Sequence, residues 1–142
     1  ACLLHDINWR AHPDYRAQLC FETVTRANIA GIDHAERIYL AFALLNRYKS
    51  GNSTAVADVY ADMVPPDRLN DAVVLGKVLR LGAMLSGSSR GVLEHAQLEL
   101  TDANLILRLD GTGAVFAGEA VERRLKNLAT RLGRTGVVLI DP

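Results

Sequence analysis

Leucine recurs at every second position on either side of a short break in QLELTDANLILRL, the segment Gln97–Leu109. A period of two is typical of strands with one buried face. The polar tripeptide Asp102-Ala103-Asn104 interrupts the alternation and predicts the turn of a β-hairpin. This segment therefore predicts a β-hairpin, whereas the sequence before it has a helical pattern.

Upstream of the hairpin, apolar residues recur with the spacing of helices. Pro13 fits the first turn of one helix, in which we expect Leu19 and Phe21 to face the core. Asp33 and Glu36 form a capping box that begins another helix. The predicted helical segments are the end of a buried helix at Ala1–Trp9 and helices over Asp14–Ala27, Asp33–Lys49, Ala55–Met63 and Asp67–Ser86, with a loop at residues 50–54.

Downstream of the hairpin, the pattern predicts an amphipathic helix over Gly118–Leu132 that ends at Gly133, followed by a buried strand at Val137–Ile140. The glycine- and serine-rich segment Ser86–Gly91 marks the clearest boundary. We expect an α+β protein, predominantly α-helical. A bundle of about five helices in residues 1–86 is followed by a small β-β-α-β region in residues 92–142 packed on it.

The composition excludes several classes of protein. The 142 residues include 16 Lys+Arg and 16 Asp+Glu, and 49% are hydrophobic, which excludes an intrinsically disordered chain. No apolar run is long enough for a membrane helix, and zero net charge provides no long-range attraction to nucleic acid or membrane surfaces. The apolar start Ala-Cys-Leu-Leu suggests the interior of a longer polypeptide. We expect Cys2 and Cys20 to be reduced core thiols, which suits a cytoplasmic protein.

Two groups of residues could carry chemistry. His5 and Asp6 are adjacent, and imidazole with carboxylate suits a divalent metal that activates water. The alternative is a buried histidine whose ring is hydrogen-bonded by Asp6 or by the backbone. The glycines of Gly111-Thr112-Gly113 fit a plain turn better than a phosphate-binding loop.

The second group is basic. Arginine contributes 13 of the 16 basic residues, and guanidinium groups match phosphate oxygens in a bidentate way. Some of these side chains could line a groove for a polyanion, although a solvated surface is the alternative for any one of them. The basic residues at the first three helical segments are Arg10, Arg16, Arg26, Arg37, Arg47 and Lys49.

Four stretches in this order resemble the C-terminal helical domain of the exopolyphosphatase/guanosine pentaphosphate phosphatase family. They are Leu4–Arg16 (LHDINWRAHPDYR), Ala30–His34 (AGIDH), Leu40–Lys49 (LAFALLNRYK) and Val78–Leu85 (VLRLGAML). The closing β-β-α-β pattern also resembles the end of that family, so the resemblance covers nearly the whole chain.

The resemblance implies that two actin-like domains, absent from this chain, precede it in the complete protein. They would hold the catalytic carboxylate and Mg²⁺ and remove terminal phosphate from polyphosphate or guanosine pentaphosphate. The complete protein would be a phosphoric anhydride hydrolase, whereas we expect this chain alone to be inactive and to contain no cofactor. Its helical part would be similar to HD-type phosphohydrolase domains, help to bind the long substrate and build the homodimer. Under this interpretation the candidate phosphate contacts are Arg10, His12, Arg16, Arg47 and Lys49.

The sequence departs from the family pattern at Leu19 and near Arg47, where relatives often place histidines. Leucine cannot ligate a metal, and arginine stays protonated. We therefore expect no metal, with His5 and Asp6 as weak candidates. Three functions stay open: a non-catalytic polyphosphate-binding and dimerisation domain, a working HD-type metallophosphohydrolase, and a pure interaction module.

Overall fold

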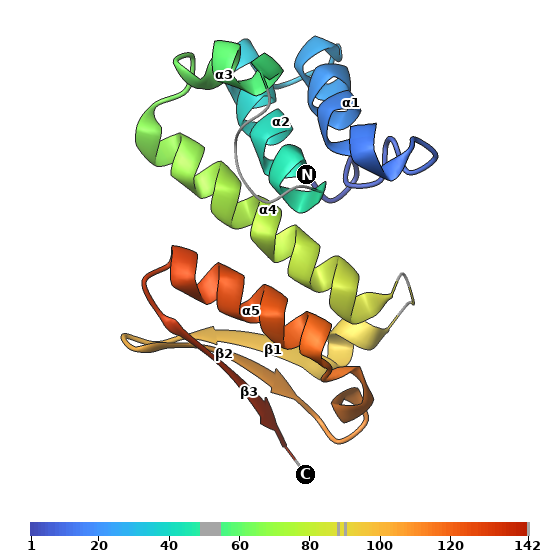
Figure 1. The fold of residues 1–142 in the computed structure, drawn as a ribbon, viewed down its shortest axis with the longest axis vertical. Helices are drawn as coiled ribbons and strands as arrows, with labels where there is room; N and C mark the ends of the chain where they lie inside the picture. The colour runs from blue at the N-terminus through green and yellow to red at the C-terminus, as the bar shows by residue number, and fades with distance from the viewer. Residues whose placement is uncertain (49–54, 88, 90, 142) are drawn as a thin grey trace. The chain divides into compact units, whose positions relative to one another are not determined.

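The computed structural model describes residues 1–48, 55–87, 89 and 91–141. Its helices and strands are α1 Pro13–Arg26, α2 His34–Tyr48, α3 Ala55–Ala61, α4 Pro66–Ser86, β1 Ala96–Leu100, β2 Asn104–Leu109, α5 Glu119–Arg131 and β3 Thr135–Ile140 (Figure 1). The predicted α+β, predominantly helical fold is confirmed. The predicted loop at residues 50–54 lies outside the described residues. Among the described helices, none is long and apolar enough to cross a bilayer.

The chain forms two compact units, Ala1–Leu79 and Arg80–Pro142, and the division falls inside α4. The described part of the first unit is helical, and the second unit contains the sheet and α5 (Figure 1). Two features of the predicted regions, residues 1–86 and 92–142, stay predictions. They are the boundaries of the regions and the packing of the second region on the first.

Helices α1 and α2 form the core of the first unit. The rings of Phe21 and Phe42 meet edge to face with centroids 5.1 Å apart, and the Tyr60 ring of α3 lies 5.7 Å from Phe21. Such aromatic pairs bury large apolar areas in a preferred geometry. The buried aliphatic side chains of α1 and α2 complete this core together with Ala57, Val64 and Ala72.

Short-range signals set where these helices begin. Asp33 Oδ1 accepts from the Glu36 backbone N–H, and Glu36 Oε2 accepts from the Asp33 N–H, both at 2.8 Å. The predicted capping box is therefore confirmed. Pro13 occupies the first turn of α1 as predicted, and His12 supplies the cap by accepting from the Asp14 N–H at 3.3 Å.

The segment Ala1–Trp9 is a succession of turns, and the prediction of a buried helix there is wrong. Its backbone bonds join residues three apart, as from the Leu4 N–H to the Ala1 carbonyl at 2.9 Å. Leu3 is fully exposed, and of this segment only Leu4 packs on the core. A short helix is marginal without a packed face, and these apolar residues lack one.

Leu19 does not lie on the buried face of α1. Leu19 is 42% exposed, so the prediction that it faces the core is wrong, whereas Phe21 is buried as predicted. The buried face follows the helical spacing of Ala17, Cys20 and Val24, and Leu19 lies outside that stripe.

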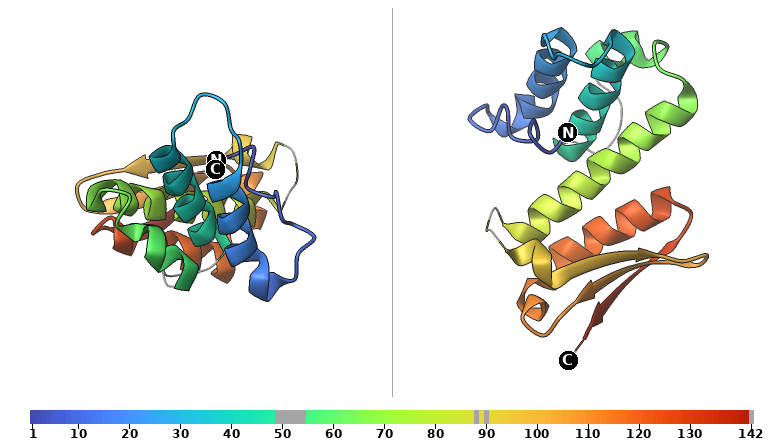
Figure 2. Two further views of the ribbon diagram at one scale, coloured as in Figure 1. Left: turned by 90° about the horizontal axis from the view of Figure 1, so that it is seen from above. Right: turned by 180° about the vertical axis from the view of Figure 1, so that it is seen from behind.

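The second unit contains a three-stranded sheet in the order β1-β2-β3. The predicted hairpin is confirmed, with β1 antiparallel to β2, and β3 pairs in parallel with the other side of β2. Helix α5 covers one face of this sheet (Figure 2), where Leu105, Leu107 and Leu109 are buried. On the other face, Arg108 pairs with Glu99 at 3.0 Å and with Asp141 at 3.6 Å.

Strand β3 lies at an edge of the sheet, which corrects part of its prediction. Leu139 is 37% exposed and Ile140 is 55% exposed, so the expectation of a wholly buried strand is wrong. An aliphatic run in the sequence predicts a strand equally well at the centre and at the edge of a sheet, because the neighbouring elements in the fold decide whether its side chains are buried.

Two predicted glycine positions are confirmed. At the end of α5, Gly133 has φ +67°, and the Gly133 and Arg134 N–H groups donate to the carbonyls of Thr130 and Ala129 at 3.1 and 2.9 Å. This is the Schellman arrangement, which favours glycine. The turn at Gly111–Gly113 is also present, and a Cβ on Gly113 would lie 2.8 Å from the His95 carbonyl oxygen.

The close approach of α4 to α2 yields a matched pair of substitutions. A Cβ on Gly76 would lie 2.3 Å from the Ala43 carbonyl oxygen and 2.6 Å from Asn46 Cβ, whereas one on Gly82 meets nothing within 4 Å. We expect Gly76→Ala to lower the free energy of unfolding by about 1–3 kcal/mol through overpacking. Gly82→Ala, in the same helix, should raise it by up to about 1 kcal/mol through helix propensity. Urea unfolding followed by circular dichroism measures both, and equal stability of the two variants would contradict the close contact.

Candidate functional site

A polar network joins the turns before α1 to the last turn of α2. Arg47 Nη2 donates to Asp6 Oδ1 at 3.0 Å. The Tyr48 hydroxyl donates to the same oxygen at 3.3 Å and also to the His5 carbonyl. The Arg47 side chain is only 13% exposed, and its Nε is buried without a hydrogen-bond partner among the described residues. The arginine is thus anchored by Asp6, with part of its donor capacity unused.

A second arginine lies on the same tyrosine. The Arg16 guanidinium carbon lies 5.7 Å from the Tyr48 ring centroid, and that of Arg47 lies 4.6 Å from it. The negative faces of aromatic rings attract such cations. Arg16 Nε and Nη2 also donate to the Ala11 carbonyl at 3.3 and 3.1 Å. We call Asp6, Arg16, Arg47 and Tyr48 the Arg47 cluster, which combines two guanidinium groups with one carboxylate.

The other predicted phosphate contacts lie apart from this cluster. The exposed Arg10 lies over the Trp9 ring, 5.0 Å from its centroid. His12 caps α1, and its ring lies 5.9 Å from that of Tyr15. In the described part of the chain, neither side chain bonds to a side chain of the cluster, although the His12 carbonyl accepts from the Arg16 backbone N–H at 3.0 Å. Lys49 lies outside the described residues, and all five phosphate contacts stay predictions.

His5 contacts both of the groups expected for a structural histidine. Its Nδ1 lies 2.6 Å from the Cys2 carbonyl oxygen, and its Nε2 lies 3.5 Å from Asp6 Oδ2. The predicted ring contacts are confirmed, whereas the predicted burial is wrong, because the side chain is 41% exposed. The ring is exposed because the turns that carry it have no packed cover.

The surroundings of Asp6 do not fit a divalent metal. Asp6 Oδ1 accepts from Arg47 and Tyr48, and the guanidinium would repel a second cation. Among the described residues, no group of three His, Cys, Asp or Glu side chains is arranged to hold a metal ion.

Burial changes the acidity of two groups beside Arg47. Burial raises the pKa of the Cys20 thiol to about 11, partly opposed by the positive charge of Arg47. Burial likewise raises the pKa of Tyr48 to about 12, again opposed by Arg47. Sequence reasoning missed Tyr48 as a site residue, and its position next to Arg47 at a helix end was the available signal.

The two cysteines should react very differently. Both are free; Cys20 is buried, but Cys2 is exposed, so the prediction of a core thiol at Cys2 is wrong. Because the thiolate is the reactive form, we expect one thiol to react rapidly with a disulfide reagent at pH 8 and the second only after unfolding. Cys2→Ser should remove the fast phase and Cys20→Ala should retain it. A fast phase that survives Cys2→Ser would contradict the burial of Cys20.

The raised pKa of Tyr48 predicts a loss of stability at high pH. An unfolded tyrosine loses its proton near its ordinary pKa of 10, before the folded one at about 12. The unfolded state therefore binds fewer protons in this window, and stability falls as the pH rises from 10 to 12. Tyr48→Phe should be less stable at pH 8 and should lose less stability over that window. Urea midpoints at pH 8, 10 and 11.5 test this, and identical pH slopes for the two proteins would refute it.

The comparison with known proteins agrees with the resemblance of the sequence. The chain matches the family model described as "Exopolyphosphatase, C-terminal" over residues 1–139. No curated protein matches the sequence. The family match covers both compact units and includes the Arg47 cluster. The chain therefore belongs to the family of exopolyphosphatase C-terminal domains.

Proposed function

We propose that this chain is the C-terminal domain of an exopolyphosphatase or guanosine pentaphosphate phosphohydrolase, and that it binds the polyphosphate substrate and self-associates without being catalytic itself. The observation that carries the proposal is the Arg47 cluster, in which two guanidinium groups lie on one tyrosine ring. Among the described residues, Arg47 pairs with the Asp6 carboxylate, whereas Arg16 donates to the Ala11 carbonyl. The family match provides the class of substrate.

A phosphate group suits this cluster better than the carboxylate that now occupies it. Asp6 offers Arg47 a single contact, at 3.0 Å to Nη2, whereas guanidinium and phosphate can form two parallel hydrogen bonds. Asp6 is 49% exposed and lies on turns with few packing contacts. A phosphate can therefore replace its carboxylate at Arg47 without opening the core.

Further phosphates of a chain substrate would reach the exposed cations nearby in the sequence. Arg10 and His12 lie six and four residues before Arg16, and both are exposed. Because their contacts with Trp9 and Asp14 are local and open to solvent, they are inexpensive to rearrange. This favours a linear polyanion, with guanosine pentaphosphate as the shorter alternative.

The remaining parts of the proposal follow from the family. We place the hydrolytic carboxylate and its Mg²⁺ in actin-like domains outside this chain, as the resemblance implies. The free thiols of Cys2 and Cys20 are compatible with a reducing compartment such as the cytoplasm.

Binding of polyphosphate to the 142-residue chain tests the proposal. We expect measurable binding at low ionic strength that weakens as salt rises, because the contacts are ionic. Asp6→Asn should tighten binding by about two- to fivefold, since it removes a competing carboxylate. Arg16→Gln should weaken binding by about tenfold through the loss of a charged hydrogen bond, and Arg10→Gln should weaken it less. Calorimetric titration with polyphosphate and with a guanosine polyphosphate measures these effects.

Arg26→Gln is the matched control, because this arginine is exposed on α1 and pairs only with Glu22 among the described residues. It should leave binding unchanged, and circular dichroism should show that every variant is folded. Polyphosphate binding that is unaffected by both Asp6→Asn and Arg16→Gln would place the site elsewhere. A wild-type chain that binds nothing at low salt would overturn the proposed binding function.

A further inference from the structure

The outer edge of β3 offers unpaired backbone groups. The N–H groups of Thr135 and Asp141 donate to the carbonyls of Ala103 and Leu109 on the β2 side, at 3.0 and 2.8 Å. Alternate residues along a strand direct their backbone groups to opposite sides. The backbone N–H and C=O groups of the odd-numbered residues of β3 therefore point toward β2. The residues whose N–H and C=O groups face away from it are Gly136, Val138 and Ile140.

This edge lacks the features that usually prevent pairing with another strand. Soluble proteins protect edge strands with lysine, proline, bulges or a cover. From Thr135 to Ile140 the strand contains only threonine, glycine and aliphatic residues, and its ladder with β2 is regular. The side chain of Ile140 is 55% exposed. The edge is thus a suitable template for a further strand.

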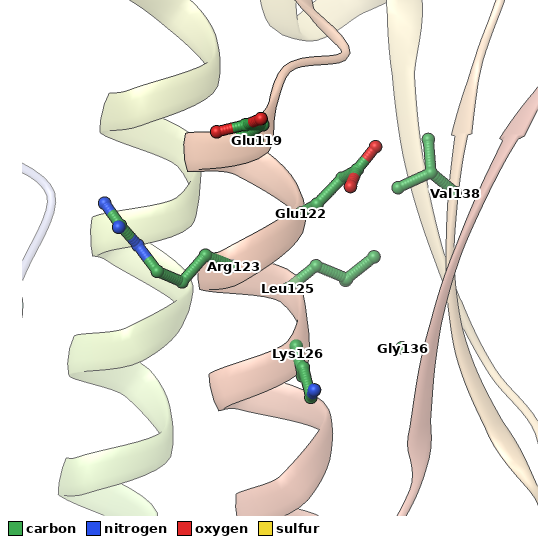
Figure 3. A pocket seen from close by; sticks show the side chains of 7 residues that line it. All are labelled: Glu119, Glu122, Arg123, Leu125, Lys126, Gly136 and Val138. Carbon is green, nitrogen blue, oxygen red and sulfur yellow. The ribbon is translucent and has the colours of Figure 1, made fainter.

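A cavity of about 550 Å³ runs between this edge and α5. In Figure 3, Glu122 and Leu125 point from α5 toward Val138, Glu119 and Lys126 lie to either side of them along the helix, and Arg123 points away. In the described part of the chain, none of the four charged side chains forms an ion pair. The exposed side of α5 is acidic in its first turn, at Glu119 and Glu122, and basic in the next turn, at Arg123 and Lys126.

We propose that a second copy of this chain docks at this edge, with the two β3 strands paired antiparallel about a two-fold axis through Val138. The inference rests on the proposed self-association and names the surface responsible for it. It joins the two sheets into one continuous sheet.

The hydrogen bonds allow only certain registers. Residues directly opposite in an antiparallel pair either bond to each other or both turn away, so outward-facing residues must pair with outward-facing residues. A register centred on Val138 pairs Gly136 with Ile140 of the second copy and uses all three outward-facing residues of each strand. Because these residues share the face covered by α5, the two α5 helices lie on the same face of the joined sheet.

The charges on α5 favour this arrangement. Gly136 lies against Lys126 and Leu125, and Glu122 points toward Val138 (Figure 3), so the axis through Val138 passes close to the middle of the segment Glu119–Lys126. An antiparallel copy about that axis places Glu119 beside Lys126 of the second copy, twice by symmetry. The two Glu119–Lys126 pairs outnumber the single like-charge contact, which is between the Glu122 side chains of the two copies near the axis.

The spacing also permits this arrangement. Helix α5 packs on both β2 and β3, and neighbouring strands lie about 4.8 Å apart. A helix axis midway between β2 and β3 would place the two α5 axes about 10 Å apart, at the upper end of the range for packed helices. The side chains of the second β3 would enter the cavity beside α5.

Sedimentation velocity of the 142-residue chain over a concentration series tests the proposal. We expect a concentration-dependent dimer. Val138→Pro should abolish it, because it removes an outward-facing N–H without touching the ladder to β2. Glu119→Lys and Lys126→Glu should each weaken the dimer by about tenfold, because each places like charges together. The double variant Glu119→Lys/Lys126→Glu should restore it to within about threefold of wild type.

The matched control is Glu94→Lys, an exposed charge reversal at the 3-10 helix before β1, which should leave the dimer intact. A dimer that survives Val138→Pro and both single charge reversals would overturn this surface while leaving self-association standing. A chain that stays monomeric at every concentration would overturn both. Polyphosphate titration of Val138→Pro separates the two proposals, since binding at the Arg47 cluster should not require this edge.

Discussion

The bonds of Asp6 with Arg47 and Tyr48 connect residues 41 and 42 positions apart in the chain. The segment that carries Asp6 is a run of turns with little buried apolar surface, whereas Arg47 and Tyr48 end a helix whose core side is buried. Segments with few packed contacts open locally at low free-energy cost. The polar network is therefore what holds the turns, and with them His5, against the helical core.

Within the Arg47 cluster, one partner of the ion pair is held firmly and the other is held loosely. Arg47 is fixed by its burial and by the ring beside it, so its position does not rely on a ligand. Its carboxylate partner comes from the least packed segment of the first unit. This combination suits the proposed binding of phosphate, because the carboxylate competes with the anion and so lowers its net free energy of binding.

The sequence predicts those parts of the fold that depend on neighbours along the chain. The capping box of Asp33 and Glu36, the terminating Gly133 and the alternating leucines of the hairpin each act over a few residues. The errors concern burial, which depends on distant partners. An apolar residue such as Leu3 or Ile140 reads as core in the sequence, and only the tertiary arrangement leaves it exposed.

The candidate site also divides into residues that local sequence features predict and residues that only the tertiary structure reveals. Arginine chemistry identified Arg16 and Arg47 as candidates, and the structure brings these two together on the ring of Tyr48. The pairing of Asp6 with Arg47 and the involvement of Tyr48 could not be predicted, because both depend on contacts across more than forty residues. His12 has a local role at the start of α1, where Ser, Thr, Asp or Asn is the commoner cap.

The parallel pairing of β3 with β2 has a consequence for the order in which the second unit folds. The hairpin closes through a short turn, whereas pairing Asn104 with Thr135 closes a loop of 31 positions (135 minus 104) that contains α5. Non-local pairings form slowly because loop closure costs entropy before any contact is gained. We therefore expect β3 to join the sheet last, after α5 has formed, so that the partly folded unit exposes the unpaired edge of β2 until that step is complete.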